Sequence, residues 1–370
     1  MNGFLKSKLR ASRRLQRKNN PSRNPIAKSL ISVLSPKILL ISVVVIAMSG
    51  IAISMESNRD PEKYKEFDNN IVRSFYILFD SAESIAIGSA ALVFLLETPE
   101  RRKREHYEAW RVINSASDQP GSGGRIQALQ DLNKDGVDLE GIAVPGADLS
   151  RIDLSFGKLL GANLQRAQLD GALLQEALLS RANLQNTSLW KTNLKRAELM
   201  DTNLRGSVLE EANLVEADLW KADLQQAKLR SANLQGATLE KASLNSASLW
   251  QANLQETNLK EADFQRASLR EAQLQQANLK RANLEGARLK EANLEGANLA
   301  NANLKEANLE SANLTNANLE SANLADANLK GANLTNANLK GANLTNANLE
   351  GTKGLVGDQL VNFLSTDTAA

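Results

Sequence analysis

The sequence predicts an all-β solenoid that is preceded by an α-helical transmembrane region. The first observation is a bulky apolar residue at every fifth position from 139 to 349, which is Leu at 41 of the 43 positions. The second is a small residue two positions before nearly all of them, which is Ala in 34 of the 43 cases. The third is a pair of apolar stretches in the N-terminal quarter, 38–55 and 75–96, of which the first carries no charge.

The five-residue period excludes both regular secondary structures. An α-helix turns about 100° per residue, so Leu side chains five apart would be spread around the whole helix. In a flat strand, side chains five apart would point to opposite faces. A strand that turns a corner every five residues instead places the small residue and the Leu inward together, and four such sides close a square coil. Small Ala permits the narrow section, and stacked Leu fills it.

Repeat units such as Ala162-Asn163-Leu164 and Ala217-Asp218-Leu219 resemble the pentapeptide-repeat proteins. The resemblance covers residues 137–352 and implies the right-handed quadrilateral β-helix of that family, with about four pentapeptide repeats per coil. About 11 coils at roughly 4.8 Å would make a rod about 50 Å long. The N-terminal region more loosely resembles membrane-anchored bacterial members of the family, notably cyanobacterial ones.

The repeat changes character along its length. From Asn293 to Asn348 the residue before each Leu is Asn at all 12 occurrences. Asn would then stack on Asn from coil to coil, and such ladders stabilise stacked strands through side-chain hydrogen bonds. The units between 137 and 212 are more mixed, with Leu173 and Leu178 at the same position. We therefore expect the C-terminal coils to be the most regular.

The composition divides the chain into eight segments. They are a basic cytoplasmic leader (1–37), a first transmembrane helix (38–55), a short loop (56–74), a second transmembrane helix (75–96), a basic juxtamembrane helix with a Gly/Ser/Pro hinge (97–124), an N-terminal capping helix (125–136), the β-helix (137–352), and a C-terminal cap and tail (353–370).

The membrane prediction depends mainly on residues 38–55. These 18 uncharged residues meet the lower length for a span, since about 20 are needed. The alternatives are a cleaved signal peptide, whose apolar stretch has only about 7–15 residues, and a buried core helix. Because the leader and Arg101–Arg104 are basic, the positive-inside rule places both ends in the cytoplasm. If only the first segment spans, the repeats lie outside instead.

The apolar stretches and their flanking charges predict an integral membrane protein with the repeat domain in the cytoplasm. The resemblance to the cyanobacterial members implies that the membrane is a bacterial inner or thylakoid-type membrane. Membrane lipids are then its first partner. The leader carries ten basic residues and no acidic one, a composition that suits anionic lipid or nucleic acid. Lipid is favoured because the leader adjoins a span, and no nucleic acid partner is expected. Tyr107 and Trp110 in the juxtamembrane helix would lie on headgroups or pack on a neighbouring helix.

Asp80 and Glu83 are candidate intramembrane polar contacts. They lie three residues apart, and therefore on one helical face, near the start of the second apolar stretch. Placement at the headgroups is the simplest interpretation. The alternatives are a polar contact between helices and a role in ion or proton transfer.

The composition excludes several kinds of chemistry. The chain has no Cys and a single His, His106, which rules out disulfides, Cys-ligated metals, Cys–His nucleophiles and multi-His metal sites. Carboxylates of the repeat alternate with basic residues, as in Lys260-Glu261, and residues 137–352 carry 22 basic against 26 acidic side chains. The sequence therefore predicts no catalytic residue, no cofactor and no metal.

Trp190, Trp220 and Trp250 are candidate partner contacts on the rod. They are spaced by 30 residues, and each directly follows an inward Leu. On a four-sided coil, Trp190 and Trp250 share a side three coils apart, and Trp220 lies opposite. The alternative is that they are isolated surface aromatics. At the C-terminal end, the expected role of residues 358–364 is capping, and the family resemblance implies that this end can also pair two rods, with Phe363 as a candidate contact.

These features together predict a non-enzymatic, membrane-tethered rod that acts as a protein-interaction scaffold at the cytoplasmic membrane face. Its protein partner is not identified by the sequence. The alternative is a transport- or channel-associated membrane protein that uses Asp80 and Glu83. A third function, implied by the resemblance to family members that mimic DNA and inhibit topoisomerases, requires a strongly negative rod. The net charge of −4 over residues 137–352 disfavours it.

Overall fold

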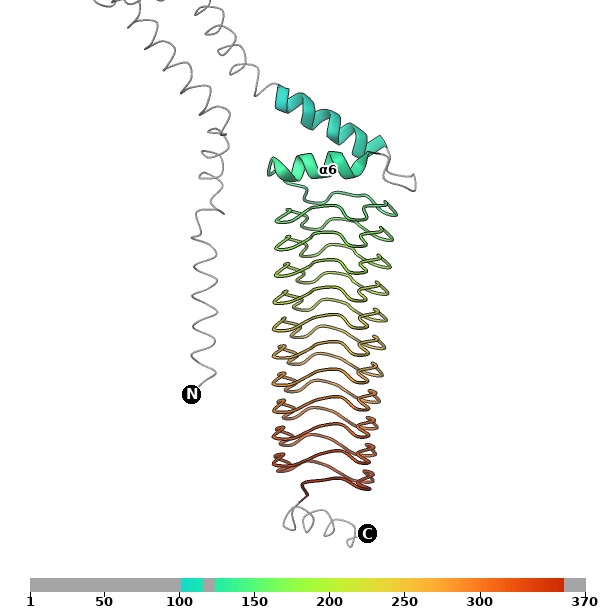
Figure 1. Ribbon diagram of the computed structural model, residues 1–370, viewed down its shortest axis with the longest axis vertical. Helices are drawn as coiled ribbons and strands as arrows, with labels where there is room; N and C mark the ends of the chain where they lie inside the picture. The colour runs from blue at the N-terminus through green and yellow to red at the C-terminus, as the bar shows by residue number, and fades with distance from the viewer. Residues whose placement is uncertain (1–100, 116–123, 356–370) are drawn as a thin grey trace, which may run out of the picture. The chain divides into compact units, whose positions relative to one another are not determined.

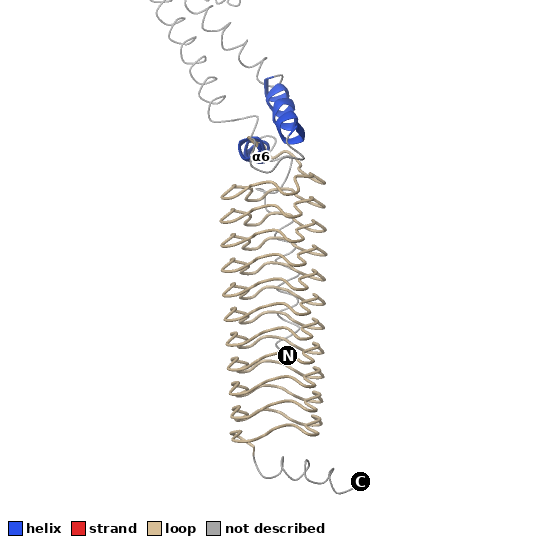
Figure 2. Ribbon diagram, turned by 90° about the vertical axis from the view of Figure 1, so that its right-hand side faces the viewer, coloured by secondary structure: helices blue, strands red, loops and turns tan. Residues whose placement is uncertain are grey.

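The computed structural model describes residues 101–115 and 124–355 (Figure 1). The chain forms two compact units, Met1–Glu105 and His106–Ala370, and the second contains the rod considered below. Residues 101–115 are helical, and helix α6 spans Arg125–Lys134. After α6 the backbone winds into stacked coils of turns and short extended segments (Figures 1 and 2).

Each coil of the rod contains 20 residues. Parallel bridges join each outward-facing residue to the one 20 positions later, without a break from Ala143–Asn163 to Asn333–Lys353. Four five-residue sides therefore complete one coil, as the sequence predicts. We number the sides by these bridging residues: side 1 runs from Lys158 to Asn338, side 2 from Ala143 to Asn343, side 3 from Asp148 to Asn348, and side 4 from Asp153 to Lys353.

The inward residues form one continuous apolar core. The Leu and Ala positions from Leu149 to Leu334 are at most 1% exposed. Phe264 replaces Leu at one inward position and is also fully buried. Thr occupies the small inward position where its hydroxyl has an acceptor, and Thr187 Oγ1 donates to the Leu164 carbonyl oxygen at 2.8 Å. Equivalent hydrogen bonds to Leu carbonyl oxygens are donated by the buried hydroxyls of Thr192, Thr202 and Thr257.

The corners are tight turns with one residue in the left-handed region. In the turn after Leu164, the Ala167 N–H donates to the Leu164 carbonyl oxygen at 3.0 Å, and Arg166 has φ +59°. The same geometry recurs at every corner, and at Gly286 and Gly296 glycine adopts it without a Cβ. We name each edge by the two sides that it joins, so edge 1/2 carries the two turn residues that follow each inward residue of side 1.

The expected Asn ladder is present. On side 4, Asn313 Nδ2 donates to Asn293 Oδ1 at 3.1 Å, and the same Asn313 accepts from the Thr315 backbone N–H at 3.1 Å. Asn313 therefore stabilises both the stacking of coils and the turn that follows it, whereas the next residue of this side, Asn333, donates to Thr315 Oγ1 instead. The expectation that the N-terminal coils would be less regular is wrong for the backbone, because Leu173 and Leu178 keep their bridges. Backbone hydrogen bonds determine the geometry of the coil, and the outward side chains only add further contacts between coils.

Helix α6 covers the first coils. Leu129 and Leu132 are buried in the same cluster as Leu139 and Ile142, and Ile113 from the preceding helix joins them. His106 Nε2 lies 2.8 Å from Asp135 Oδ2, just beyond α6. Apolar side chains of the first coils are thereby kept from solvent. Of the predicted C-terminal cap, only residues 353–355 lie within the described part of the chain.

No helix in the described ranges is long and apolar enough to cross a membrane. α6 has ten residues, about 15 Å at 1.5 Å per residue, which is half of the roughly 30 Å hydrocarbon core. Residues 101–115 carry seven charged side chains. The predicted localisation, an integral membrane protein with a cytoplasmic repeat domain, is overturned by this finding, and the α-helical transmembrane part of the fold prediction is not supported. The stretches 38–55 and 75–96 lie outside the described residues.

Candidate partner-binding surface

The three repeat-region tryptophans lie on two edges of the rod. Trp190 and Trp250 follow inward residues of side 3 and so share edge 3/4, three coils or about 14 Å apart. Trp220 follows an inward residue of side 1 and lies on edge 1/2, diagonally across the rod. Trp190 is 42% exposed, and Trp220 and Trp250 are partly buried. With 20 residues per coil, tryptophans that are 30 residues apart lie on opposite edges, and those 60 apart share one edge, as the sequence predicts.

Each of these indoles is covered by a cation. Lys191 Nζ lies 4.2 Å from the ring centroid of Trp190, and Lys221 Nζ lies 4.2 Å from that of Trp220. The Arg230 guanidinium lies 4.3 Å from the ring centroid of Trp250, one coil away on the same edge. Such contacts contribute about 0.5–1 kcal/mol at exposed sites. They favour one orientation of each ring, so the rings are partly preorganised features of the surface.

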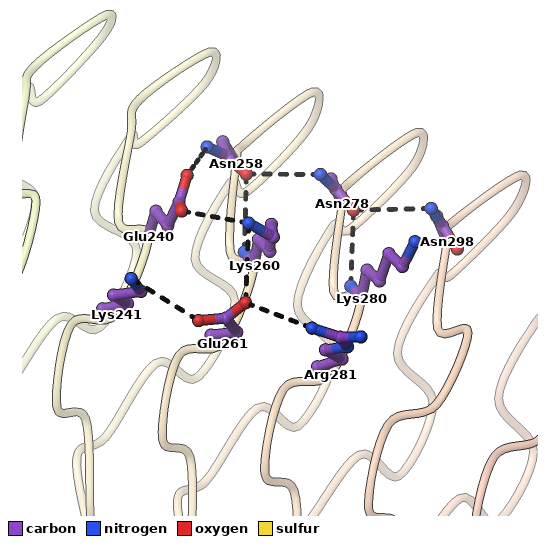
Figure 3. Close-up of polar contacts among 9 residues, drawn as sticks. All are labelled: Glu240, Lys241, Asn258, Lys260, Glu261, Asn278, Lys280, Arg281 and Asn298. Atoms are coloured by element: carbon purple, nitrogen blue, oxygen red, sulfur yellow. Dashed lines mark hydrogen bonds and ion pairs between the residues drawn. The ribbon is translucent and has the colours of Figure 1, made fainter. Parts of the chain in front are cut away.

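The charges of the rod are paired along the edges. On edge 1/2, Lys260 Nζ donates to Glu240 Oε1 at 3.2 Å and lies 3.5 Å from Glu261 Oε1 (Figure 3). Glu261 also lies near Lys241 and Arg281, at 3.7 and 3.9 Å. The hydrogen bond to Glu240 raises the pKa of Lys260. Both carboxylates of this edge therefore lie beside a basic side chain of their own coil or of an adjacent coil.

Edge 3/4 carries similar pairs below the tryptophans. Lys290 Nζ donates to Glu310 Oε1 at 2.8 Å, and Lys330 Nζ lies 2.9 Å from Glu350 Oε2. The hydrogen bond from Lys290 holds the pKa of Glu310 below its ordinary value of 4.5. Both residues are solvated, so these pairs fix local side-chain geometry and add little to stability.

We expect the Glu310 carboxyl to titrate below its ordinary pKa of 4.5 in the folded rod. Because the folded pKa is the lower one, the pair stabilises the rod above the unfolded pKa, and this contribution is lost as the pH falls through the folded pKa. NMR titration of the side-chain carboxyl carbon measures the value, and Lys290→Met should raise it. An unchanged titration in Lys290→Met would show that Lys290 does not cause the shift, and Lys340→Met serves as the control.

The described residues contain no cluster suited to metal binding. No group of three or more His, Cys, Asp or Glu side chains within residues 101–115 and 124–355 is arranged to hold a metal ion. Asp80, Glu83 and Phe363 lie outside the described residues, so their predicted roles stay predictions. Sequence reasoning missed Arg230 as the partner of Trp250. The signal that could have found it is the 20-residue period itself.

Overlapping matches to the model of the Pentapeptide repeats family run from residue 147 to residue 351, more than half of the chain. The chain belongs to the pentapeptide-repeat family. Pentapeptide-repeat proteins are generally non-enzymatic structural or interaction proteins. The matches are confined to the repeat, so they do not extend to the narrower membrane-anchored type that the N-terminal region resembles.

Solved structures of other pentapeptide-repeat proteins are similar to this one. HetL from the cyanobacterium Nostoc sp. strain PCC 7120, a protein involved in heterocyst differentiation regulation, is 34% identical, with a TM-score of 0.30 over 60% of this chain and 93% of HetL. Rfr23 from the cyanobacterium Cyanothece 51142 is 39% identical, with a TM-score of 0.18 over 29% of this chain and 63% of Rfr23.

The plasmid-mediated fluoroquinolone resistance protein QnrB1 is 20% identical, with a TM-score of 0.29 over 55% of this chain and 96% of QnrB1. No curated protein matches the chain. At these TM-scores the three structures add nothing to the family assignment and carry no argument about function.

Proposed function

We propose that this pentapeptide-repeat protein is a non-enzymatic scaffold whose rod binds a protein partner along edge 3/4. The observation that carries the proposal is the pair Trp190 and Trp250, which lie on one edge about 14 Å apart, each under a cation. Trp is enriched among the residues that dominate binding energy at protein interfaces. A partner segment that lies along the edge can contact both rings at once.

The stacked backbone suits such a role. Coil-to-coil hydrogen bonds, such as Leu189 N–H to the Val208 carbonyl oxygen at 2.7 Å, continue through the whole repeat. A partner has less ordering of these rings to do, because Lys191 and Arg230 already lie over them. Binding then loses little conformational entropy, which is the usual advantage of a preorganised surface.

The paired charges favour this function over DNA mimicry. A DNA mimic presents rows of unbalanced carboxylates, whereas on this rod Glu211, Glu261 and Glu310 each lie within 4 Å of a Lys. Residues 137–352 have a net charge of only −4. A surface of this kind suits a partner recognised by aromatic contacts more than one recognised by long-range electrostatic attraction.

Site-specific photo-crosslinking in cells of the source organism tests the proposal. A photoreactive residue at Gln251, on edge 3/4, should capture a partner that the same residue at Gln226, on edge 2/3, does not. The double variant Trp190→Ala/Trp250→Ala should reduce capture at least tenfold, since truncating such an anchor typically costs about 2 kcal/mol or more.

The matched control is Trp220→Ala on edge 1/2, which should leave capture unchanged. Circular dichroism should show the same rod in every variant, because none of these rings lies in the core. Equal capture from both edges, or capture that ignores the double variant, would refute edge 3/4 as the binding surface.

A further inference from the structure

A second surface, on side 1 of the N-terminal coils, is unusually apolar. Leu178 is the outward residue of side 1, and Leu160, Met200 and Trp220 occupy the first turn position of edge 1/2 in neighbouring coils. These four side chains are partly exposed. Phe156, at the corner where side 1 begins, is 56% exposed. The corresponding positions further along the rod are mainly polar.

The C-terminal coils of the same side lack this character. There Asn298 Nδ2 donates to Asn278 Oδ1 at 3.5 Å and Asn278 Nδ2 to Asn258 Oδ1 at 3.3 Å, beside the Lys260–Glu261 pairs (Figure 3). Polar groups in those coils bond to the coil next to them. The N-terminal coils of side 1 are therefore the part with apolar area left to bury.

Two opposite charges flank the centre of this patch symmetrically. Lys158 lies one coil before Leu178 and Glu198 one coil after it, in the same bridged column. The column spacing separates them by roughly 10 Å. Within the described residues neither forms an ion pair, in contrast to neighbours such as Lys191 and Arg196. Along the rod the patch is thus first positive, then apolar, then negative.

We propose that side 1 of these coils binds the same side of a second copy of this chain, with the two rods antiparallel. A two-fold axis at Leu178 places Lys158 opposite Glu198 of the second copy, and the reverse, and places Leu160 opposite Met200 of the second copy. Ser180, which is only 9% exposed, lies between Leu160 and Met200 and leaves room for the contact. A two-fold interface requires a self-complementary surface, and this arrangement provides one.

The charges decide the direction of the rods. In a parallel pair, Lys158 would face Lys158 and Glu198 would face Glu198, which is repulsive. Within the column of side 1, the first unfavourable positions of the antiparallel pair are Asp138 and Asp218, two coils from the axis, which would face each other. The contact therefore spans three coils. Three coils are only about 14 Å of rod length. A contact this short is smaller than a standard interface, which buries roughly 800 Å² per partner, so the dimer should be weak and depend on protein concentration.

Thiol crosslinking tests the pairing directly, because the chain has no Cys. In the full-length protein, Leu178→Cys lies on the proposed axis and should give a dimer with a short bis-maleimide. The matched control is Ser248→Cys, an equally accessible position on the opposite side 3. We expect at least tenfold more crosslinked dimer from position 178. Equal yields from the two positions would overturn the proposal.

Charge reversal tests the orientation. Lys158→Glu and Glu198→Lys each place like charges opposite one another, so each should raise the dimer dissociation constant at least tenfold in sedimentation equilibrium. The double variant Lys158→Glu/Glu198→Lys restores opposite charges and should return the constant to within threefold of the parent protein. This rescue separates pairing from a general loss of folding.

A dimer that both single variants leave unchanged would refute side 1 and would place the contact elsewhere, for example at the C-terminal end near Phe363. A chain that stays monomeric at all concentrations would refute the proposal as well. Dimerisation through side 1 is independent of partner binding on edge 3/4, so Trp190→Ala/Trp250→Ala should leave dimerisation unchanged.

Discussion

Replacing Phe264 with Ala should lower the free energy of unfolding by about 3–5 kcal/mol. Phe264 is fully buried at an inward position, stacked between the coils that carry Leu244 and Leu284. Its removal leaves a cavity that the rigid hydrogen-bonded coils on either side cannot close. Denaturant unfolding followed by circular dichroism measures the loss, and hydrogen exchange should locate the weakened coils around residue 264.

Phe264→Leu is the matched control. It restores the residue found at nearly every other inward position and should change stability by less than about 1.5 kcal/mol. If the Ala variant were as stable as the Leu variant, the coils would have to collapse around the missing ring. The rod would then be far more deformable than its continuous ladder of backbone hydrogen bonds indicates.

Leu132→Asp should detach helix α6 and leave the first coil open. Leu132 is fully buried in the cluster that joins α6 to Leu139 and Ile142. An unpaired carboxylate at that place costs several kcal/mol, more than a ten-residue helix can offset by docking. The uncovered coil end has unpaired strand groups and apolar side chains, so the variant should aggregate.

Light scattering and hydrogen exchange measure the two effects of uncapping. Gln130→Asp adds the same charge to a partly exposed position of α6. In this control α6 should stay docked and the protein should stay monodisperse. A Leu132→Asp protein that stays monodisperse, with α6 still protected from exchange, would show that the rod does not need this cap.

The sequence was enough to predict the square cross-section of the rod, because the bulky inward residue of each side determines it. Leu at every fifth position leaves no regular helix or flat strand that buries it, and four sides close the coil. The Asn ladder followed from the same register. The prediction that the coils around Leu173 and Leu178 would be less regular was wrong, because backbone bonds between coils do not depend on the outward side chain.

The surface was harder to predict because its contacts join residues one coil apart. Arg230 and Trp250 are 20 positions apart, so the coil length makes them neighbours, but it does not tell which of two neighbouring side chains turns toward the other. Lys158, Leu178 and Glu198 form a column for the same reason. Hydropathy of the N-terminal quarter led to a membrane localisation, whereas the described helices are short and charged and overturn it.

The identical corners have a consequence for how the length of such a chain can change. Each side takes five residues, so an insertion of five would turn everything beyond it by a quarter of a revolution around the rod axis. Trp190 would then no longer share an edge with Trp250, although every coil would still close. An insertion of 20 residues keeps the angular phase and changes only the height. The molecule can therefore lengthen by whole coils without disturbing its surfaces. A shorter insertion instead changes which residues before it and after it share an edge of the rod.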